Sequence, residues 1–141
     1  MTDLQNARRI LQEGGYTCVL CRSDEIHTSQ ARGVRPLVQW LTFGPNLQGF
    51  SAADKVVGKA TAYLYCLLGV KAVHSLVMSG AAAEVLRENG IAVTQDTLVE
   101  NIINRSGDGI CPFEAAVWEI HTPAEALPAI RKKMEEMNIS L

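Results

Sequence analysis

The sequence has no large excess of charge of either sign. Its 141 residues include 13 Lys and Arg against 15 Asp and Glu, which gives a formal net charge of −2. A protein that grips a nucleic-acid backbone or an anionic membrane surface by long-range attraction needs a strong positive field. We therefore expect neither nucleic acid nor membrane among the partners of this protein.

Long hydrophobic runs are also missing. The longest apolar stretch lies between Lys59 and Lys71, and as a helix it would span roughly 16 Å, about half of a bilayer core. The amino-terminal residues carry charges and amides where a secretory signal would need apolar side chains. These absences predict a buried helix instead of a membrane span, and a cytoplasmic protein.

Neither proline nor glycine is in excess, with 5 and 11 residues, while hydrophobic residues make up 48% of the chain and charged residues 20%. This composition excludes collagen-like repeats, low complexity and disorder. At about 150 residues per domain, the length predicts a single domain over residues 1–141.

Cysteine occurs at four positions, and without a secretory signal these predict reduced thiols instead of a disulfide framework. Cys18 and Cys21 have the spacing of a zinc knuckle or a redox pair, but residues three apart in a strand point to opposite faces. No second cysteine pair completes a set of four ligands. Two ordinary strand cysteines are therefore expected, with no metal and no cofactor, and Cys66 is expected to pack in the core.

The spacing of apolar residues predicts an alternation of helices and strands. Tyr16 to Ser29 should form a hairpin, and the order helix, strand, helix, strand after residue 51 implies a parallel pair with a right-handed crossover. The expected helices cover residues 3–13, 35–43, 51–68 and 81–88, with two more beginning near 112 and 123; the expected strands cover 16–22, 25–29, 70–78 and 91–94, and 97–104 is expected to form helical turns.

One of these predicted helices combines a start signal with a cluster of charge. Ser51 and Asp54 have the spacing of a capping box, which would place Asp54, Lys55 and Lys59 within two helical turns. Cations near a helix amino terminus are unfavourable, and a bound anion would remove that penalty. Gly58 in mid-helix would cost about 1 kcal/mol relative to Ala, unless a ligand or another backbone approaches closely. The alternative is a solvated lysine pair with a packing glycine.

Cys111 differs from the other cysteines because it lies between a two-glycine turn and Pro112, at the start of a predicted helix. Backbone N–H groups in that position stabilise a thiolate. The nearby carboxylate of Glu114 has the opposite effect. A reactive thiol and a small buried cap residue are the two interpretations.

Several polar residues fall where α/β proteins bind ligands. Ser79 and Gly80 follow the predicted central strand, at the carboxyl end where open sheets hold their ligands. Arg32 and Arg35 flank a flexible turn, and their guanidinium groups are suited to a phosphate or carboxylate. The alternative is that both side chains are merely solvated. Asn101, Asn104 and Arg105 would either line the same cleft or cap and solvate a loop.

Four short segments carry a resemblance to a known family; they are Arg32-Gly-Val-Arg-Pro-Leu37, Asp54-Lys-Val-Val-Gly-Lys-Ala60, Asn104-Arg105 and Cys111-Pro-Phe-Glu114. In this order they resemble a small bacterial family of unknown function with a fold similar to that of the cytidine deaminases, over roughly residues 14–135. The resemblance implies a three-layer α-β-α fold with a mixed sheet of four to five strands and helices on both faces. The zinc ligands and catalytic Glu of the zinc deaminases are missing from their expected positions, so the resemblance implies the cleft without the zinc chemistry.

The predicted function is binding of a small anionic or nucleotide-like ligand in the cleft at the carboxyl ends of the strands. Any catalysis would be zinc-free, with Cys111 as nucleophile or with acid–base chemistry of Lys, Asp and Glu side chains. The expected catalytic residues are Cys111, Glu114, Asp54 and Lys59, and the expected ligand-binding residues are Arg35, Lys55, Gly58, Ser79, Gly80, Asn104 and Arg105. The predicted crossover would place Asp54 and Ser79 at the same edge of the sheet. The alternatives are a non-catalytic binding or sensing domain and a homo-oligomeric scaffold with Trp40, Phe43 and Phe50 at its interface.

Overall fold

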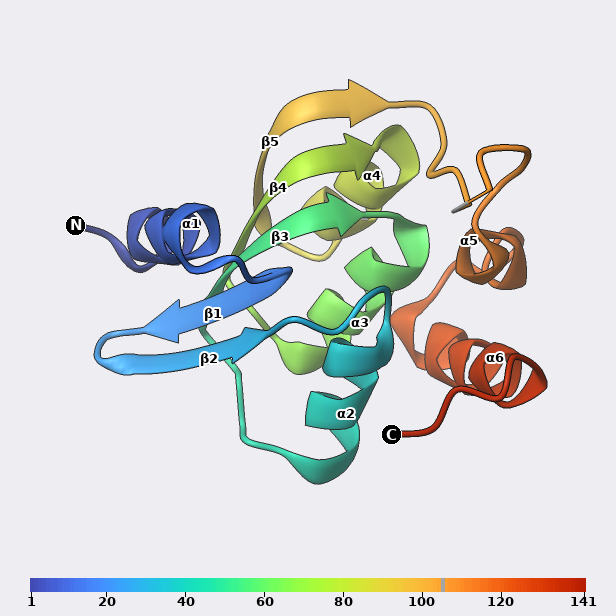
Figure 1. The fold of residues 1–141 in the computed structure, drawn as a ribbon, viewed down its shortest axis with the longest axis horizontal. Helices are drawn as coiled ribbons and strands as arrows, with labels where there is room; N and C mark the ends of the chain where they lie inside the picture. Colours follow the sequence, from blue (N-terminus) through green and yellow to red (C-terminus); the bar gives the residue numbers. More distant parts are fainter. Residues whose placement is uncertain (105) are drawn as a thin grey trace.

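A mixed β-sheet forms the centre of the computed structural model, which describes residues 1–104 and 106–141. Within these residues the strands lie in the order β2-β1-β3-β4-β5 (Figure 1). Their bounds are β1 Cys18–Arg22, β2 Glu25–Ser29, β3 Ser51–Val57, β4 Ala72–Ser79 and β5 Ala92–Val99. β1 is antiparallel to β2 and β3, whereas β3, β4 and β5 are parallel. The predicted α/β class with a mixed sheet of four to five strands is confirmed.

Helices cover both faces of this sheet, as predicted (Figure 1). They are α1 Asp3–Gly14, α2 Arg35–Phe43, α3 Lys59–Leu68, α4 Gly80–Glu88, α5 Pro112–Ala116 and α6 Pro123–Glu136. On one face Ala7 and Leu11 of α1 pack against the alternate residues Val19, Cys21 and Ala53. The larger core lies on the opposite face, where the other helices bury their apolar sides.

α3 lies at the centre of that larger core. It contacts α2, α4 and α6, and almost every residue from Ala60 to Tyr65 is buried. A helix that is apolar on all sides is stable only when it is surrounded by other elements. The apolar run between Lys59 and Lys71 is therefore a buried helix and the start of the turn beyond it, and no helix of the described residues is long and apolar enough to span a membrane.

The amino-terminal hairpin and its cysteines match the prediction. Cys18 faces the larger core and Cys21 faces α1, so the two thiols point to opposite sides of β1. All four cysteines are free, and Cys66 packs against the larger core in a half-buried position. Because successive side chains of a strand point to opposite faces, two cysteines whose spacing suggests a shared site are kept apart.

The predicted helix from Ser51 to Leu68 is wrong in its first half. Ser51–Val57 is strand β3, Gly58 is the N-cap residue of α3, and the helix begins at Lys59. Ser51 is fully buried in the strand, and its hydroxyl has no hydrogen-bond partner among the described residues. Pairing with two neighbouring strands outweighs a local capping pattern here.

The predicted helical turns over residues 97–104 are also wrong, because β5 continues to Val99 beside β4. Ile103 then forms an isolated antiparallel bridge with Ile110. The chain leaves the sheet between these two points, and this segment forms one side of the hollow described next.

Candidate functional site

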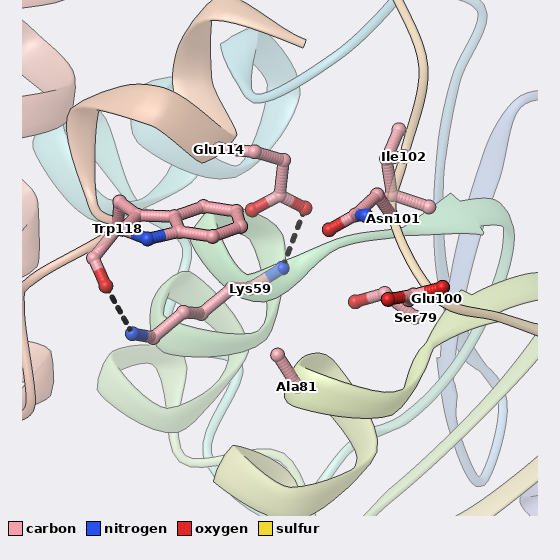
Figure 2. A pocket seen from close by; sticks show the side chains of 8 residues that line it. All are labelled: Lys59, Ser79, Ala81, Glu100, Asn101, Ile102, Glu114 and Trp118. Carbon is pink, nitrogen blue, oxygen red and sulfur yellow. Dashed lines mark hydrogen bonds between the residues drawn. The ribbon is translucent and has the colours of Figure 1, made fainter. Parts of the chain in front are cut away.

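A small hollow of about 180 Å³ opens at the carboxyl ends of the three parallel strands (Figure 2). Each strand contributes a residue at or just beyond its carboxyl end: Lys59 comes after β3, Ser79 ends β4 and Asn101 comes after β5. In open α/β sheets this is the edge at which ligands bind. The complete lining is Lys59, Ser79, Ala81, Glu100, Asn101, Ile102, Glu114 and Trp118.

Glu114 reaches across the hollow to the first turn of α3. The backbone N–H of Lys59 donates to its Oε1 at 2.7 Å, and that of Ala60 donates to its Oε2 at 3.3 Å. The N-cap residue Gly58 has no side chain for this purpose, so a residue from α5 caps α3 instead. A carboxylate at this position also interacts favourably with the helix dipole.

Gly58 leaves the space that this carboxylate needs. A Cβ on Gly58 would overlap Glu114 Oε1 and crowd Ile102 Cγ1. The backbone of Gly58 is ordinary extended chain, with φ of −99° and ψ of −177°, so conformational freedom is not the reason for glycine. The close approach at Gly58, which was predicted for a ligand or another backbone, is made instead by the Glu114 side chain.

Burial dominates the electrostatics of Glu114, which is only 7% exposed. Burial raises the pKa of this carboxyl, while the N–H groups of Ala60 and Lys59 and the ammonium charge of Lys59 act in the opposite direction. Both oxygens already accept hydrogen bonds from α3. This arrangement suits a structural cap better than a proton carrier.

Lys59 and Trp118 form another wall of the hollow. Lys59 Nζ donates to the backbone carbonyl of Trp118 at 3.2 Å and lies 5.7 Å from the centre of the Tyr63 ring. The Trp118 side chain is 56% exposed, and Figure 2 shows its indole across the hollow from Asn101. An exposed indole beside an ammonium group offers a flat surface and a positive charge together.

The amino terminus of α4 adds donors to the same hollow. Ser79 is its N-cap, and the hydroxyl oxygen accepts the backbone N–H of Ala82 at 3.1 Å. The preceding N–H groups, of Gly80 and Ala81, have no intrahelical acceptor because they belong to the first turn. Glu100 and Asn101 complete the rim from the end of β5.

The structure brings together some of the residues predicted for the site. Lys59, Ser79 and Glu114 line the hollow, and Gly58 and Gly80 lie at the helix starts beside it. The others lie elsewhere: Asp54 and Lys55 within β3, Arg35 at the exposed start of α2, Cys111 before α5, and Asn104 in a loop bonded to Asp108. Arg105 lies outside the described residues.

The expected clustering of Asp54, Lys55 and Lys59 within two turns of one helix is wrong, because the first two belong to a strand. Asp54 also does not lie at the edge of the sheet with Ser79, since it pairs with Ser75 inside the sheet. Lys59 occupies that edge instead. Parallel strands end together, so the residue after β3 meets the residue that ends β4.

Cys111 is half-buried and packs against the larger core. Its backbone N–H donates to the carbonyl of Ile102 at 3.0 Å, and its side chain makes no capping hydrogen bond to α5. It is not among the side chains around the hollow. Cys111 is the N-cap residue of α5, as one of its two interpretations predicted, although it is half-buried and not fully buried. Its role as nucleophile stays a prediction.

Asp54 belongs to a separate polar chain between β1, β3 and α3. The Tyr65 hydroxyl donates to Asp54 Oδ2 at 2.6 Å, and Cys18 Sγ lies 3.1 Å from the same hydroxyl. Burial raises the pKa of Asp54 to about 6, although hydrogen bonds from Tyr65 and from the Val56 N–H oppose the shift. Burial likewise raises the pKa of Cys18. Asp54 is therefore a partly buried carboxyl group that titrates near pH 6.

Sequence reasoning missed three lining residues, Glu100, Ile102 and Trp118, whereas it gave a place in the cleft as one of two alternatives for Asn101. Glu100 and Ile102, like Asn101, follow β5, and the β-branched residues Val93, Thr94, Thr97 and Val99 would have extended the predicted strand to its end. Trp118 follows a five-residue helix, and no periodicity marks its position.

The chain was also compared with known proteins. No curated protein matches it. The crystal structure of a DUF1893 family protein (TM1506) from Thermotoga maritima is similar with a TM-score of 0.86 and 26% identity, over 94% of this chain and 91% of that chain. A diaminohydroxyphosphoribosylaminopyrimidine deaminase/5-amino-6-(5-phosphoribosylamino)uracil reductase from the same organism matches with a TM-score of 0.41 and 17% identity, over 65% of this chain and 34% of that chain. The second likeness is too weak to support a conclusion about this protein.

The family described as a domain of unknown function (DUF1893) matches residues 6–134. These residues include the whole sheet and every side chain that lines the hollow. The protein belongs to the DUF1893 family.

Proposed function

We propose that this protein binds a small planar anion in the hollow at the carboxyl ends of β3, β4 and β5. The observation that supports this most directly is the meeting of the Lys59 ammonium, the Trp118 indole and the amino terminus of α4 around one cavity. An aromatic face stacks on a flat ring, while an ammonium and free backbone N–H groups favour an oxyanion.

The size of the hollow limits the ligand. Sites for drug-sized molecules have volumes of about 300–1,000 Å³, whereas this cavity measures about 180 Å³. A single ring with a small substituent is compatible with that volume, and a complete nucleotide is not. The predicted nucleotide-like ligand is thereby narrowed to the size of a nucleobase.

The contacts around the hollow favour binding over catalysis. Both oxygens of Glu114 accept N–H groups of α3, and Cys111 is not part of the lining. A subunit interface has less support: Phe50 is 2% exposed and Trp40 packs against the core, leaving Phe43, at 71%, as the most exposed of the three aromatic residues proposed for it.

Three compounds test separately whether the site needs a polar ring and a carboxylate. Orotate has both, uracil has the polar ring without the carboxylate, and benzoate has a carboxylate on an apolar ring. We expect orotate to stabilise the protein most. At ten times its Kd it should add about 1.4 kcal/mol to the free energy of unfolding and raise Tm by about 4 °C. Differential scanning fluorimetry over a concentration series measures this shift.

Two variants show whether the effect arises in the hollow. Lys59→Met keeps the side-chain stem but removes the charge, and it should abolish the advantage of orotate over uracil. Lys132→Met removes an exposed charge on α6 and should leave the response unchanged. Equal orotate stabilisation in wild type and Lys59→Met, or no stabilisation by any of the three compounds, contradicts the proposed function.

A further inference from the structure

A second hollow opens on the face of the sheet that carries α1. This helix packs on β1 and β3 and reaches only part of β4, so the sheet beyond it is uncovered. The hollow measures about 420 Å³ and lies where α1 meets this uncovered region. Its walls include Arg8 of α1, Lys55 of β3, and Leu76 of β4.

Two cations from different elements face this space. Arg8 and Lys55 are both exposed, and within the described residues neither forms a salt bridge. The neighbouring Arg9 differs, because it bonds to Glu13 and Asn6 of its own helix. Glu13, an acidic residue of the same helix, is thus already paired with Arg9.

The floor of the hollow is fixed by His74, which is 3% exposed. His74 Nε2 lies 3.3 Å from Asp96 Oδ1, and Nδ1 lies 2.7 Å from the Thr94 hydroxyl. Burial lowers the pKa of His74, the charge of Arg8 adds to this effect, and Asp96 opposes it. In the neutral ring the Nε2–H donates to the carboxylate, which can only accept, and Nδ1 accepts from the hydroxyl.

These contacts leave the hollow with a positive balance. His74 holds the Asp96 carboxylate at one side and adds no charge of its own when neutral. The two cations outnumber this single carboxylate. An Arg guanidinium is suited to two parallel hydrogen bonds with an oxyanion, and a Lys ammonium adds a compact charge.

We propose that Arg8 and Lys55 bind the oxyanion of a small phosphorylated compound in this hollow. A phosphate monoester carries nearly two negative charges at neutral pH, which match the two cations. The volume of about 420 Å³ falls within the range of about 300–1,000 Å³ found for small-molecule sites, so it holds an organic group beside the phosphate. Leu76, which is 41% exposed, offers that group an apolar surface.

Titration with glycerol 3-phosphate, followed by ¹⁵N–¹H NMR at constant ionic strength, tests this site. We expect saturable shifts of the backbone amides of Gln12 and Gly15, which border the hollow. Arg8→Ala and Lys55→Ala should each weaken binding by about fivefold or more. Arg9→Ala is the control. It removes a neighbouring charge that bonds to Glu13 and Asn6 and does not line the hollow, so this variant should bind glycerol 3-phosphate as the wild type does.

Two further titrations identify the part of the ligand that is recognised. Glycerol should produce no saturable shift, because it lacks the oxyanion. Inorganic phosphate should bind more weakly than the ester if the organic group contacts Leu76. Equal affinity of phosphate and the ester would still support the oxyanion site and identify free phosphate as sufficient.

The proposal is overturned if Arg8→Ala and Lys55→Ala titrate as the wild type does. It is also overturned if the shifts centre on Ser79 and Asn101, because those residues border the other hollow. Since the two hollows share no lining residue, failure of one proposal is distinguishable from failure of the other.

Discussion

Replacement of Gly58 by Ala is expected to lower the free energy of unfolding by about 3 kcal/mol. The new Cβ would occupy the position of Glu114 Oε1, so the carboxylate must leave the first turn of α3. Two N–H groups then lose a charged acceptor, and hydrogen bonds to charged groups contribute about 1.5–3 kcal/mol each. Chemical denaturation monitored by circular dichroism measures the loss.

A double-mutant cycle assigns this cost to the contact with Glu114. Glu114→Ala removes the cap and also vacates the space, so adding Gly58→Ala to it should cost little more. The expected coupling energy is about 2 kcal/mol, well above the error for independent sites. Some residual cost is expected because the Cβ also crowds Ile102.

Gly80→Ala is the matched control for this cycle. Gly80 also begins a helix at the edge of the same hollow, and a Cβ there would meet no atom within 4 Å. Its replacement should leave stability unchanged or raise it by up to about 1 kcal/mol. If Gly58→Ala is as mild as this control, or if the two effects at 58 and 114 simply add, the structural role of Glu114 is refuted.

Asp54 should make the wild-type protein less stable as the pH rises. Its pKa of about 6 in the folded protein lies above the ordinary aspartate value of 3.8, so between these two pH values the folded state holds a proton that the unfolded state releases. The stabilisation is complete below about pH 3.8 and disappears as the pH passes 6. The total effect is about 3 kcal/mol, of which about 2 kcal/mol falls between pH 4.5 and 7.5.

Asp54→Asn removes this titrating group, and the difference in unfolding free energy between wild type and variant should therefore change by about 2 kcal/mol over that range. Urea denaturation at fixed pH values measures it. Asp24→Asn, in the exposed turn of the hairpin, should keep the wild-type pH profile. A constant difference between wild type and Asp54→Asn would contradict the prediction.

Tyr65→Phe provides a second measurement on the same chain of contacts. The Tyr65 hydroxyl stabilises the ionised form of Asp54 by donating to Oδ2 at 2.6 Å. Without that donor the pKa of Asp54 should rise further. The loss of stability should then extend to a higher pH than in the wild type, in addition to any constant cost of the substitution.

Elements with a clear local pattern could be predicted from the sequence. The hairpin joins the apolar run of β1 to the alternating segment of β2 through a short turn. The two faces of β1 separate Cys18 from Cys21 as expected. α2 and α4 also lie close to their predicted bounds. In these elements local preference and tertiary packing favour the same structure.

β3 could not be predicted because its local pattern and its environment disagree. Ser51 and Asp54 have capping-box spacing, and Ala52 and Ala53 favour helix. The segment nevertheless lies between β1 and β4, where small side chains allow α1 and α3 to approach from the two faces. Nothing near residue 51 in the sequence specifies those neighbours.

The candidate site could be predicted only in part, because some of its residues also lack a local pattern that marks their position. Lys59, Ser79 and Glu114 were placed near a cleft by helix-start signals, and these residues do line the hollow. Trp118 lies in an irregular segment after the short helix α5, so its position depends on the docking of that helix. Hydrophobic periodicity cannot locate a residue in such a segment.

The Glu114 cap has a consequence for the order in which the chain folds. It joins α3 to a residue 55 positions later in the sequence, and contacts of such separation close a large loop and form late. Until α5 docks, the first N–H groups of α3 must be hydrated. Because Gly58 leaves room for this contact, we expect the small hollow to be complete only after α5 has docked.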